Sequence, residues 1–231
     1  MVLVQEMENV NLIYRICYKK EGSLIFISQL DMQDVLQRAF RRGRIKLEFT
    51  EGFNPHPKLS FSPPLPLFAS SDEEYFEIAL TESYEVKELK QVLEQELPEG
   101  ISINWIVELD ENGGRLKDFL KWAEYKIELK SPLDNTQTVK LINTYLTNTD
   151  EIVVTKRNKK KKMVEKNITE QIKIATCYIE DNKIMLQATL SLVNDSLLNP
   201  PTLVNAITQN IEVLSELKVL TTKKIKTFDN I

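Results

Sequence analysis

The order in which hydrophobic periodicity changes along the chain is the strongest constraint on its fold. An apolar, strand-forming run occupies Leu12–Tyr18, and apolar residues then recur every three or four positions over Leu30–Phe40. They alternate with charged residues over Ile45–Phe49. The three-to-four spacing is typical of an amphipathic helix, and alternation is typical of a half-buried strand. The sequence therefore begins with a strand, a helix and a second strand.

The same order of patterns continues to residue 109 and then recurs. Strand patterns over Tyr75–Leu80 and Ile101–Leu109 enclose a helix pattern over Val86–Leu97, which completes the β-α-β-β-α-β order of a ferredoxin-like fold. Asn112-Gly113-Gly114 is the clearest boundary signal, since paired glycines favour loops. Beyond it the expected elements are a short helix, a strand, a helix, a strand, a hairpin, a helix and a strand, at residues 116–122, 125–129, 139–146, 152–156, 172–192, 200–207 and 217–225. We therefore predict an α+β fold of two ferredoxin-like halves with mostly antiparallel sheets, residues 1–112 and 113–231.

Four local signals refine this prediction. Ser28 is the expected N-cap of the first helix, with Asp31 in the acidic position of a capping box. Gly43 is expected just past the end of that helix, where glycine commonly adopts left-handed backbone. Asp181-Asn182 is the expected turn of a hairpin, because these residue types favour turns. The three acids at residues 72–74 precede a strand pattern and are interpreted as a solvated loop.

Composition indicates a cytoplasmic protein with no membrane segment. No stretch of the 231 residues approaches the roughly 18–20 apolar residues that a membrane-spanning helix needs. The first twelve residues carry two acids and no Lys or Arg, so they lack the cationic start of a signal peptide. Cys17 and Cys177 lie far apart within apolar runs, so we expect two buried free thiols and no thiol-based zinc or iron–sulfur site. The predicted cofactors and metals are none.

Charge is strongly segregated along the chain although the net charge is only −4. The segment Arg15–Pro66 has nine Lys and Arg against five acids, whereas Asp72–Glu111 has thirteen acids against two Lys. A second basic cluster at Lys156–Lys166 has seven cations and one acid, and is expected to form a hairpin tip or a loop. A chain with a slightly negative net charge can therefore still have a basic surface on each half.

The proline-rich segment that follows Ile45–Phe49 holds the main candidate binding residues. Its Asn54-Pro55-His56-Pro57 stretch is stiff, since each proline fixes its own φ and restricts the preceding residue. His56 is the chain's single histidine, and it can act as a ligand contact or acid–base group, or else bond only to neighbouring backbone. The candidate ligand- or RNA-binding residues are Arg38, Arg41, Arg42, Arg44, Asn54, His56, Lys58 and Ser60.

Several short segments of unusual composition resemble one bacterial family. The segments are Ile27-Ser28-Gln29-Leu30-Asp31, Arg38 with Arg41-Arg42, Gly52–Phe61 (GFNPHPKLSF), Pro63-Pro64-Leu65-Pro66 and Glu74-Tyr75. Together they resemble the domain family known as radical-SAM-linked, whose members are fused to, or encoded beside, a radical SAM protein. The resemblance covers Phe26 to about Leu80.

This resemblance implies association with a radical SAM partner, and it implies no particular activity. Gln29 stands where the family commonly has histidine. If that histidine were catalytic in the family, this chain would lack it.

Three functions remain open at the level of sequence. The first is an RNA-binding accessory module, for tRNA or rRNA, in which one side of a cleft is lined for phosphates by Arg38, Arg41, Arg42, Arg44 and Lys58. The second is an interaction subunit that docks a radical SAM enzyme or presents substrate to it through the Pro63–Pro66 surface. The third is an enzyme that uses His56, although no GxSxG, Walker, GxGxxG or HExxH motif is present and no catalytic residue is predicted. We expect Gly52–Phe61 to line the main pocket, with His56 and Lys58 directed toward Arg41 and Arg42.

Overall fold

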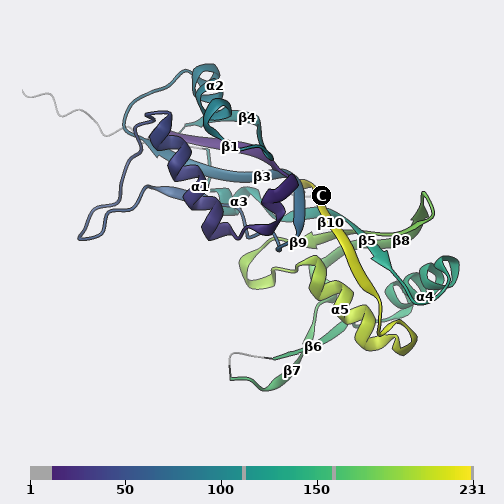
Figure 1. Ribbon diagram of the computed structural model, residues 1–231. Helices are drawn as coiled ribbons and strands as arrows, with labels where there is room; N and C mark the ends of the chain where they lie inside the picture. Colours follow the sequence, from purple (N-terminus) through teal and green to yellow (C-terminus); the bar gives the residue numbers. More distant parts are fainter. Residues whose placement is uncertain (1–11, 111–112, 158–159, 230–231) are drawn as a thin grey trace, which may run out of the picture.

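The computed structural model describes residues 12–110, 113–157 and 160–229, and it shows two helix-covered sheets joined edge to edge (Figure 1). The strands of the first half are β1 (Leu12–Lys20), β2 (Leu59–Phe61), β3 (Ala69–Leu80) and β4 (Ile101–Leu109). Its helices are α1 (Gln29–Arg42) and α2 (Val86–Glu96), and a short 3-10 helix, η1 (Gly22–Phe26), precedes α1. A short helix, α3 (Leu116–Phe119), leads into the second half.

The second half is built in the same way. Its sheet strands are β5 (Trp122–Lys130), β8 (Ile172–Glu180), β9 (Lys183–Ser191) and β10 (Lys218–Phe228), and its helices are α4 (Asn135–Asn148) and α5 (Pro200–Asn210). A separate hairpin, β6 (Val153–Arg157) with β7 (Met163–Asn167), is inserted between α4 and β8. It carries the described residues of the basic cluster, which the sequence placed in a hairpin tip or loop. Short 3-10 helices at Thr169–Gln171, Asn194–Ser196 and Glu212–Leu214 complete the described elements.

Strand order confirms the α+β fold with two ferredoxin-like halves. The first half has the order β4-β1-β3-β2 and the second β10-β5-β9-β8, so each is a split βαβ unit with its first and third strands at the centre. All pairings within the halves are antiparallel. The two units are fused into one eight-stranded sheet by a parallel contact between β3 and β10. The boundary between residues 112 and 113 stays a prediction, and residue 112 lies outside the described residues.

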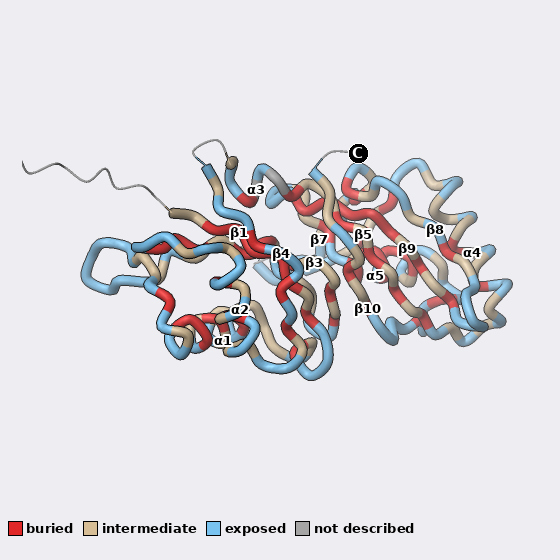
Figure 2. Tube along the Cα trace, turned by 90° about the horizontal axis from the view of Figure 1, so that it is seen from above, coloured by how far each residue is buried: buried red, intermediate tan, exposed pale blue. Residues whose placement is uncertain are grey.

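The junction between the halves is short. Only three residue pairs join β10 to β3, from Thr222↔Ala69 to Lys224↔Ser71, while β2 pairs with the other end of the same edge of β3. Buried residues form two cores, one beneath α1 and α2 and one beneath α4 and α5 (Figure 2). Cys17 and Tyr75 of the first half pack into the second core, so the cores meet across the junction. Both cysteines are buried and free, as predicted.

Two local predictions about turns and caps are confirmed, and a third is confirmed in position but not in backbone conformation. Ser28 caps α1 in a full capping box with Asp31, and Asp181 and Asn182 both have positive φ, as a type I′ hairpin turn requires. Gly43, however, is right-handed at φ −72°, and the left-handed residue is Arg44 at φ 54°. Glycine is needed at position 43 for space instead, because an added Cβ would lie 2.7 Å from Cγ1 of Val92 on α2.

Two predicted segments are corrected by the sheet. The expected strand at Ile45–Phe49 is reduced to isolated bridges, Leu47↔Leu80 and Phe49↔Pro57, and the second strand of the unit is Leu59–Phe61. This short run between Pro57 and Ser62 contains no proline, so its N–H groups are free to pair with β3. Residues 72–74, interpreted as a solvated loop, lie inside β3 because groups on β10 partner their side chains.

Candidate functional site

Three consecutive acids of β3 tie the two halves together. Asp72 forms an ion pair of 2.7 Å with Nζ of Lys223, and Glu74 forms one of 2.5 Å with Nζ of Lys224. Glu73 accepts a hydrogen bond of 2.9 Å from the backbone N–H of Thr227. A run of acids that would repel one another on a solvated loop is therefore held by cations and an N–H group of the neighbouring strand.

Three charged side chains at this junction are almost completely buried. Lys20, Glu74 and Lys224 are 5%, 3% and 1% exposed. Glu74 also accepts a hydrogen bond of 3.0 Å from the buried Ser62 hydroxyl, and Lys20 donates one of 3.1 Å to the carbonyl of Ile27. With three buried charged side chains, this cluster is the most highly charged environment of the described core. Burying a charge costs free energy unless hydrogen bonds or opposite charges replace the lost water.

Burial shifts the pKa values of the neighbouring groups in opposite directions. Desolvation lowers the pKa of Lys20, and the nearby Glu74 carboxylate partly opposes that effect. Desolvation raises the pKa of the Tyr18 hydroxyl well above its ordinary value, and Glu74 adds to the rise. Tyr18 therefore stays protonated under physiological conditions, while Lys20 is easier to deprotonate than a surface lysine.

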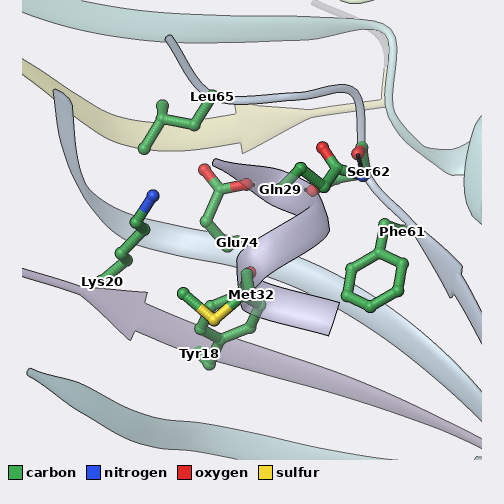
Figure 3. Close-up of a pocket in the computed structure, with 8 residues that line it drawn as sticks. All are labelled: Tyr18, Lys20, Gln29, Met32, Phe61, Ser62, Leu65 and Glu74. Atoms are coloured by element: carbon green, nitrogen blue, oxygen red, sulfur yellow. Dashed lines mark hydrogen bonds between the residues drawn. The ribbon is translucent and has the colours of Figure 1, made fainter. Parts of the chain in front are cut away.

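A small cavity lies against this cluster (Figure 3). Its volume is about 20 Å³, which is room for about one water-sized group. The lining residues come from β1, α1, β3 and the chain that leads out of β2: Tyr18, Lys20, Gln29, Met32, Phe61, Ser62, Leu65 and Glu74. In Figure 3 the Lys20 ammonium and the Glu74 carboxylate both point toward the side on which Leu65 lies.

A larger cleft of about 370 Å³ adjoins the small cavity and lies between the two halves. The two cavities share Gln29, Phe61 and Ser62. The first half adds Pro63 and Pro64, and the second half supplies the opposite wall with Leu116, Asp118, Leu120, Lys121, Leu192, Val193 and Asn194. We call the small cavity and this cleft together the junction site.

The junction site collects most parts of the sequence motif. Gln29 comes from the ISQLD segment, Phe61 from GFNPHPKLSF, Leu65 from PPLP and Glu74 from the Glu-Tyr strand. These segments are scattered over nearly fifty residues, and the split βαβ topology brings them to one place. The motif is therefore arranged as the lining of a site rather than as a single loop.

The predicted binding residues lie elsewhere. His56 is exposed on an arm, residues 48–58, that projects beyond the rest of the first half in Figures 1 and 2. Its N–H donates to Oγ1 of Thr50, and its carbonyl accepts from the Thr50 N–H. Of the predicted loop Gly52–Phe61, Phe61 lines the junction site and residues 58–60 line another hollow, whereas His56 lines neither.

Lys58 and Ser60 are engaged within the first half. Lys58 pairs with Glu48 across the arm, and the Ser60 hydroxyl donates to Glu77 at 3.1 Å. Both line an open hollow of about 280 Å³ beside β3. Arg42 pairs with Glu96 of α2 at 2.8 Å, so Lys58 and Arg42 have separate partners instead of facing a common ligand.

The remaining predicted residues are exposed. Arg38, Arg41, Arg44 and Asn54 are all exposed, and within the described residues none of the three arginines pairs with a carboxylate. Sequence reasoning missed Lys20, Lys224 and Tyr18, and it misread Glu74. The one sequence feature that pointed to this buried cluster was Glu74-Tyr75, which is part of the family resemblance.

The described residues contain no group of three or more His, Cys, Asp or Glu side chains placed to hold a metal ion. None of the helices in the described ranges is both long enough and apolar enough to cross a membrane.

This protein is an α+β protein of two fused ferredoxin-like units with a motif-lined site at their junction. The model of a family described as "uncharacterized protein conserved in bacteria" (DUF2344) matches residues 14–200, and the chain belongs to that family. This confirms the resemblance to an uncharacterised bacterial family. No curated protein matches the chain.

The fold is also found among solved structures. A chain of the crystal structure of a Cbf5-Nop10-Gar1 complex is 11% identical with a TM-score of 0.51, over 93% of this chain and 48% of that one. The present chain thus spans about half the length of that relative, and the likeness concerns the fold alone. An unknown protein from Galdieria sulphuraria is 9% identical over 94% of this chain and 99% of its own, with a TM-score of 0.26.

Proposed function

We propose that this protein is a cytoplasmic RNA-binding accessory module that acts with a radical SAM protein in RNA modification or processing. The observation that carries the RNA proposal is the end of α1, where Arg38, Arg41 and Arg44 expose guanidinium groups that have no carboxylate partner in the described chain. Surface arginines without a carboxylate partner favour the binding of phosphate, because phosphate oxygens accept hydrogen bonds from the paired N–H groups of a guanidinium. The buried free thiols agree with a reducing compartment.

The arm next to these arginines offers groups of a second kind. Phe49 is 51% exposed and Phe53 is fully exposed, and aromatic rings on a surface can stack against unpaired bases. The β6–β7 hairpin adds exposed cations from the other half, including Lys156 and Arg157. In the view of Figure 1 the arm and the hairpin project on the same side of the molecule. Phosphate contacts from both halves would orient an RNA strand along this side of the molecule.

The triple variant Arg38→Ala/Arg41→Ala/Arg44→Ala is expected to bind RNA about tenfold or more weakly, because three phosphate contacts are lost. The slope of log affinity against log salt should fall by about 2, since each contact to single-stranded RNA contributes roughly 0.7. Filter binding of tRNA and of an unstructured RNA at several salt concentrations measures both quantities. Arg42→Ala is the matched control, because Arg42 already pairs with Glu96. Unchanged affinity and slope in the triple variant would remove the RNA proposal.

A second function, docking of the radical SAM protein, is favoured by an exposed aromatic pair. Phe26 of η1 and Phe68 are 63% and 65% exposed and contact each other edge to face, with ring centroids 5.8 Å apart. Phe68 has a left-handed backbone, φ 66°, fixed by its N–H donating to the carbonyl of Ile25 at 2.8 Å. Such strain in a non-glycine residue costs about 1–3 kcal/mol and clusters at functional positions. Both residues border the motif segments that the resemblance identified.

Phe26→Ser/Phe68→Ser is expected to abolish binding of a radical SAM protein from the same organism, with little change in melting temperature. Titration of the two purified proteins by calorimetry measures the loss. Phe53→Ser is the control, because Phe53 is as exposed but lies on the arm. Equal binding by the double variant and the wild type would refute docking through the aromatic pair.

A further inference from the structure

The buried charges of the junction site do not balance. Lys20 and Lys224 contribute two ammonium groups, and Glu74 is the carboxylate that faces them. One oxygen of Glu74 pairs with Lys224, and the other accepts from the Ser62 hydroxyl. The second contact is a hydrogen bond, whereas Oε1, which pairs with Lys224, accepts none from the described residues. Glu74 attracts Lys20 through space but forms no ion pair with it. Among the described residues, Lys20 makes one hydrogen bond, to a neutral carbonyl.

An ammonium in this position is costly. Lysine carries three donors, and Lys20 uses one of them on Ile27. The cost of burying a charge is several kcal/mol unless an opposite charge or hydrogen bonds compensate it. The cavity of about 20 Å³ that Lys20 lines is the space available for a compensating group. It accepts a single oxygen atom, and its size excludes a whole phosphate group.

The adjoining cleft supplies the remaining space. Gln29, Phe61 and Ser62 form the wall common to the small cavity and to the 370 Å³ cleft between the halves. A ligand in the cleft could therefore place one oxygen next to Lys20 when the Gln29 side chain moves aside. The Gln29 amide makes only a long hydrogen bond, 3.4 Å, to the carbonyl of Ser62. Leu65, between Pro64 and Pro66, closes the cavity on the side toward which Lys20 and Glu74 point (Figure 3).

We propose that the junction site binds an oxyanion, a phosphate or carboxylate group, with one oxygen against the Lys20 ammonium and the rest of the ligand in the cleft between the halves. The bound oxygen supplies the negative charge that the cluster of Lys20, Glu74 and Lys224 lacks. The site uses none of the exposed arginines or the arm, so it is separate from the proposed RNA surface. Its test needs no RNA.

Thermal unfolding of the full chain in inorganic phosphate, acetate or chloride at matched ionic strength and pH tests this site. A ligand that binds the folded state alone raises the melting temperature, by about 2–4 °C at concentrations well above its dissociation constant. We expect such a rise with phosphate, acetate or both, and none with chloride. The oxyanion that raises the melting temperature more shows whether the bound oxygen comes from a phosphate or a carboxylate group. No rise with either overturns the proposal.

Lys20→Met assigns the effect to this site. The variant keeps a side chain of similar length and removes the charge, so we expect it to lose the oxyanion response and to be at least as stable as the wild type without ligand. Lys223→Met is the control, because Lys223 pairs with Asp72 at the surface. If phosphate or acetate raises the melting temperature of Lys20→Met as much as that of the wild type, the anion binds elsewhere and the proposal is overturned. If Lys20→Met does not fold, the pH dependence of the wild type decides.

Oxyanion stabilisation of the wild type should weaken as pH rises, because only the protonated amine attracts an anion. Burial lowers the pKa of Lys20, so this loss should begin at lower pH than for a surface lysine. The titratable groups that line the cavity with Lys20 are Tyr18 on β1 and Glu74 on β3, and Lys224 on β10 pairs with Glu74. A stabilisation that does not change up to the unfolding pH excludes Lys20 as the anion ligand.

Discussion

Glu74→Gln is expected to lower the free energy of unfolding by about 3–5 kcal/mol, the cost of removing one partner from a buried ion pair. Glu74 is the carboxylate facing Lys224 and Lys20, and the amide that replaces it leaves two buried ammonium groups without a counter-charge. It also weakens the hydrogen bond from Ser62. Urea unfolding at pH 7 measures the change.

Asp72→Asn is the matched control for this experiment. Asp72 pairs with the neighbouring Lys223, but both side chains are partly exposed, so its loss should cost less than about 1 kcal/mol. Adding Lys224→Met to Glu74→Gln should recover part of the lost stability, because the unpaired cation is then removed. A cost for Glu74→Gln as small as that of Asp72→Asn would show that water reaches the pair.

Gly100→Ala is expected to destabilise the protein by about 2–4 kcal/mol. Gly100 has φ +95°, a backbone conformation that L-residues rarely adopt, and an added Cβ would lie 2.6 Å from the carbonyl oxygen of Glu21. That oxygen belongs to backbone, so it cannot move aside as a side chain would. The Gly100 carbonyl also accepts the Glu21 N–H at 2.9 Å, which ties the end of β1 to the start of β4.

Gly22→Ala separates the steric effect from the backbone effect. Gly22 also has positive φ, +61°, but an added Cβ has nothing within 4 Å. This substitution should cost about 1–2 kcal/mol, the price of a left-handed L-residue. Chemical denaturation of both variants measures the difference, and equal costs would contradict the predicted clash at Gly100.

The sequence predicts the class of fold well because each half is specified by local patterns. The helical spacing after Ser28 and the Asp181-Asn182 turn lie within short windows, and the structure confirms both. Leu59–Phe61 was missed because three residues carry too little periodicity to outweigh the surrounding prolines. The alternation over Ile45–Phe49 was stronger, yet in the fold it makes only isolated bridges to Leu80 and Pro57.

The candidate site was harder to predict because its partners are distant in sequence. Nothing near Glu74 in the sequence indicates that Lys224 will neutralise it. One carboxylate in a run of three acids is interpreted as solvent-exposed unless the strand that pairs with it is known. His56 attracted attention as the single histidine, but its exposure on the arm gives it no role in the junction site. Whether His56, Asn54 and the exposed arginines bind a ligand stays a prediction.

The three-residue contact between β3 and β10 has a consequence for the order in which the chain matures. During synthesis the first unit emerges with its β3 edge at Ala69–Ser71 uncovered, and Glu74 faces that edge before its lysine exists. Nearly the whole second unit must be translated before β10 can pair with this edge of β3 and place Lys224 next to Glu74. An open strand edge is a template for wrong pairing. The nascent first unit therefore depends on the timing of its last strand, and slow translation between the two units would be the step most prone to misassembly.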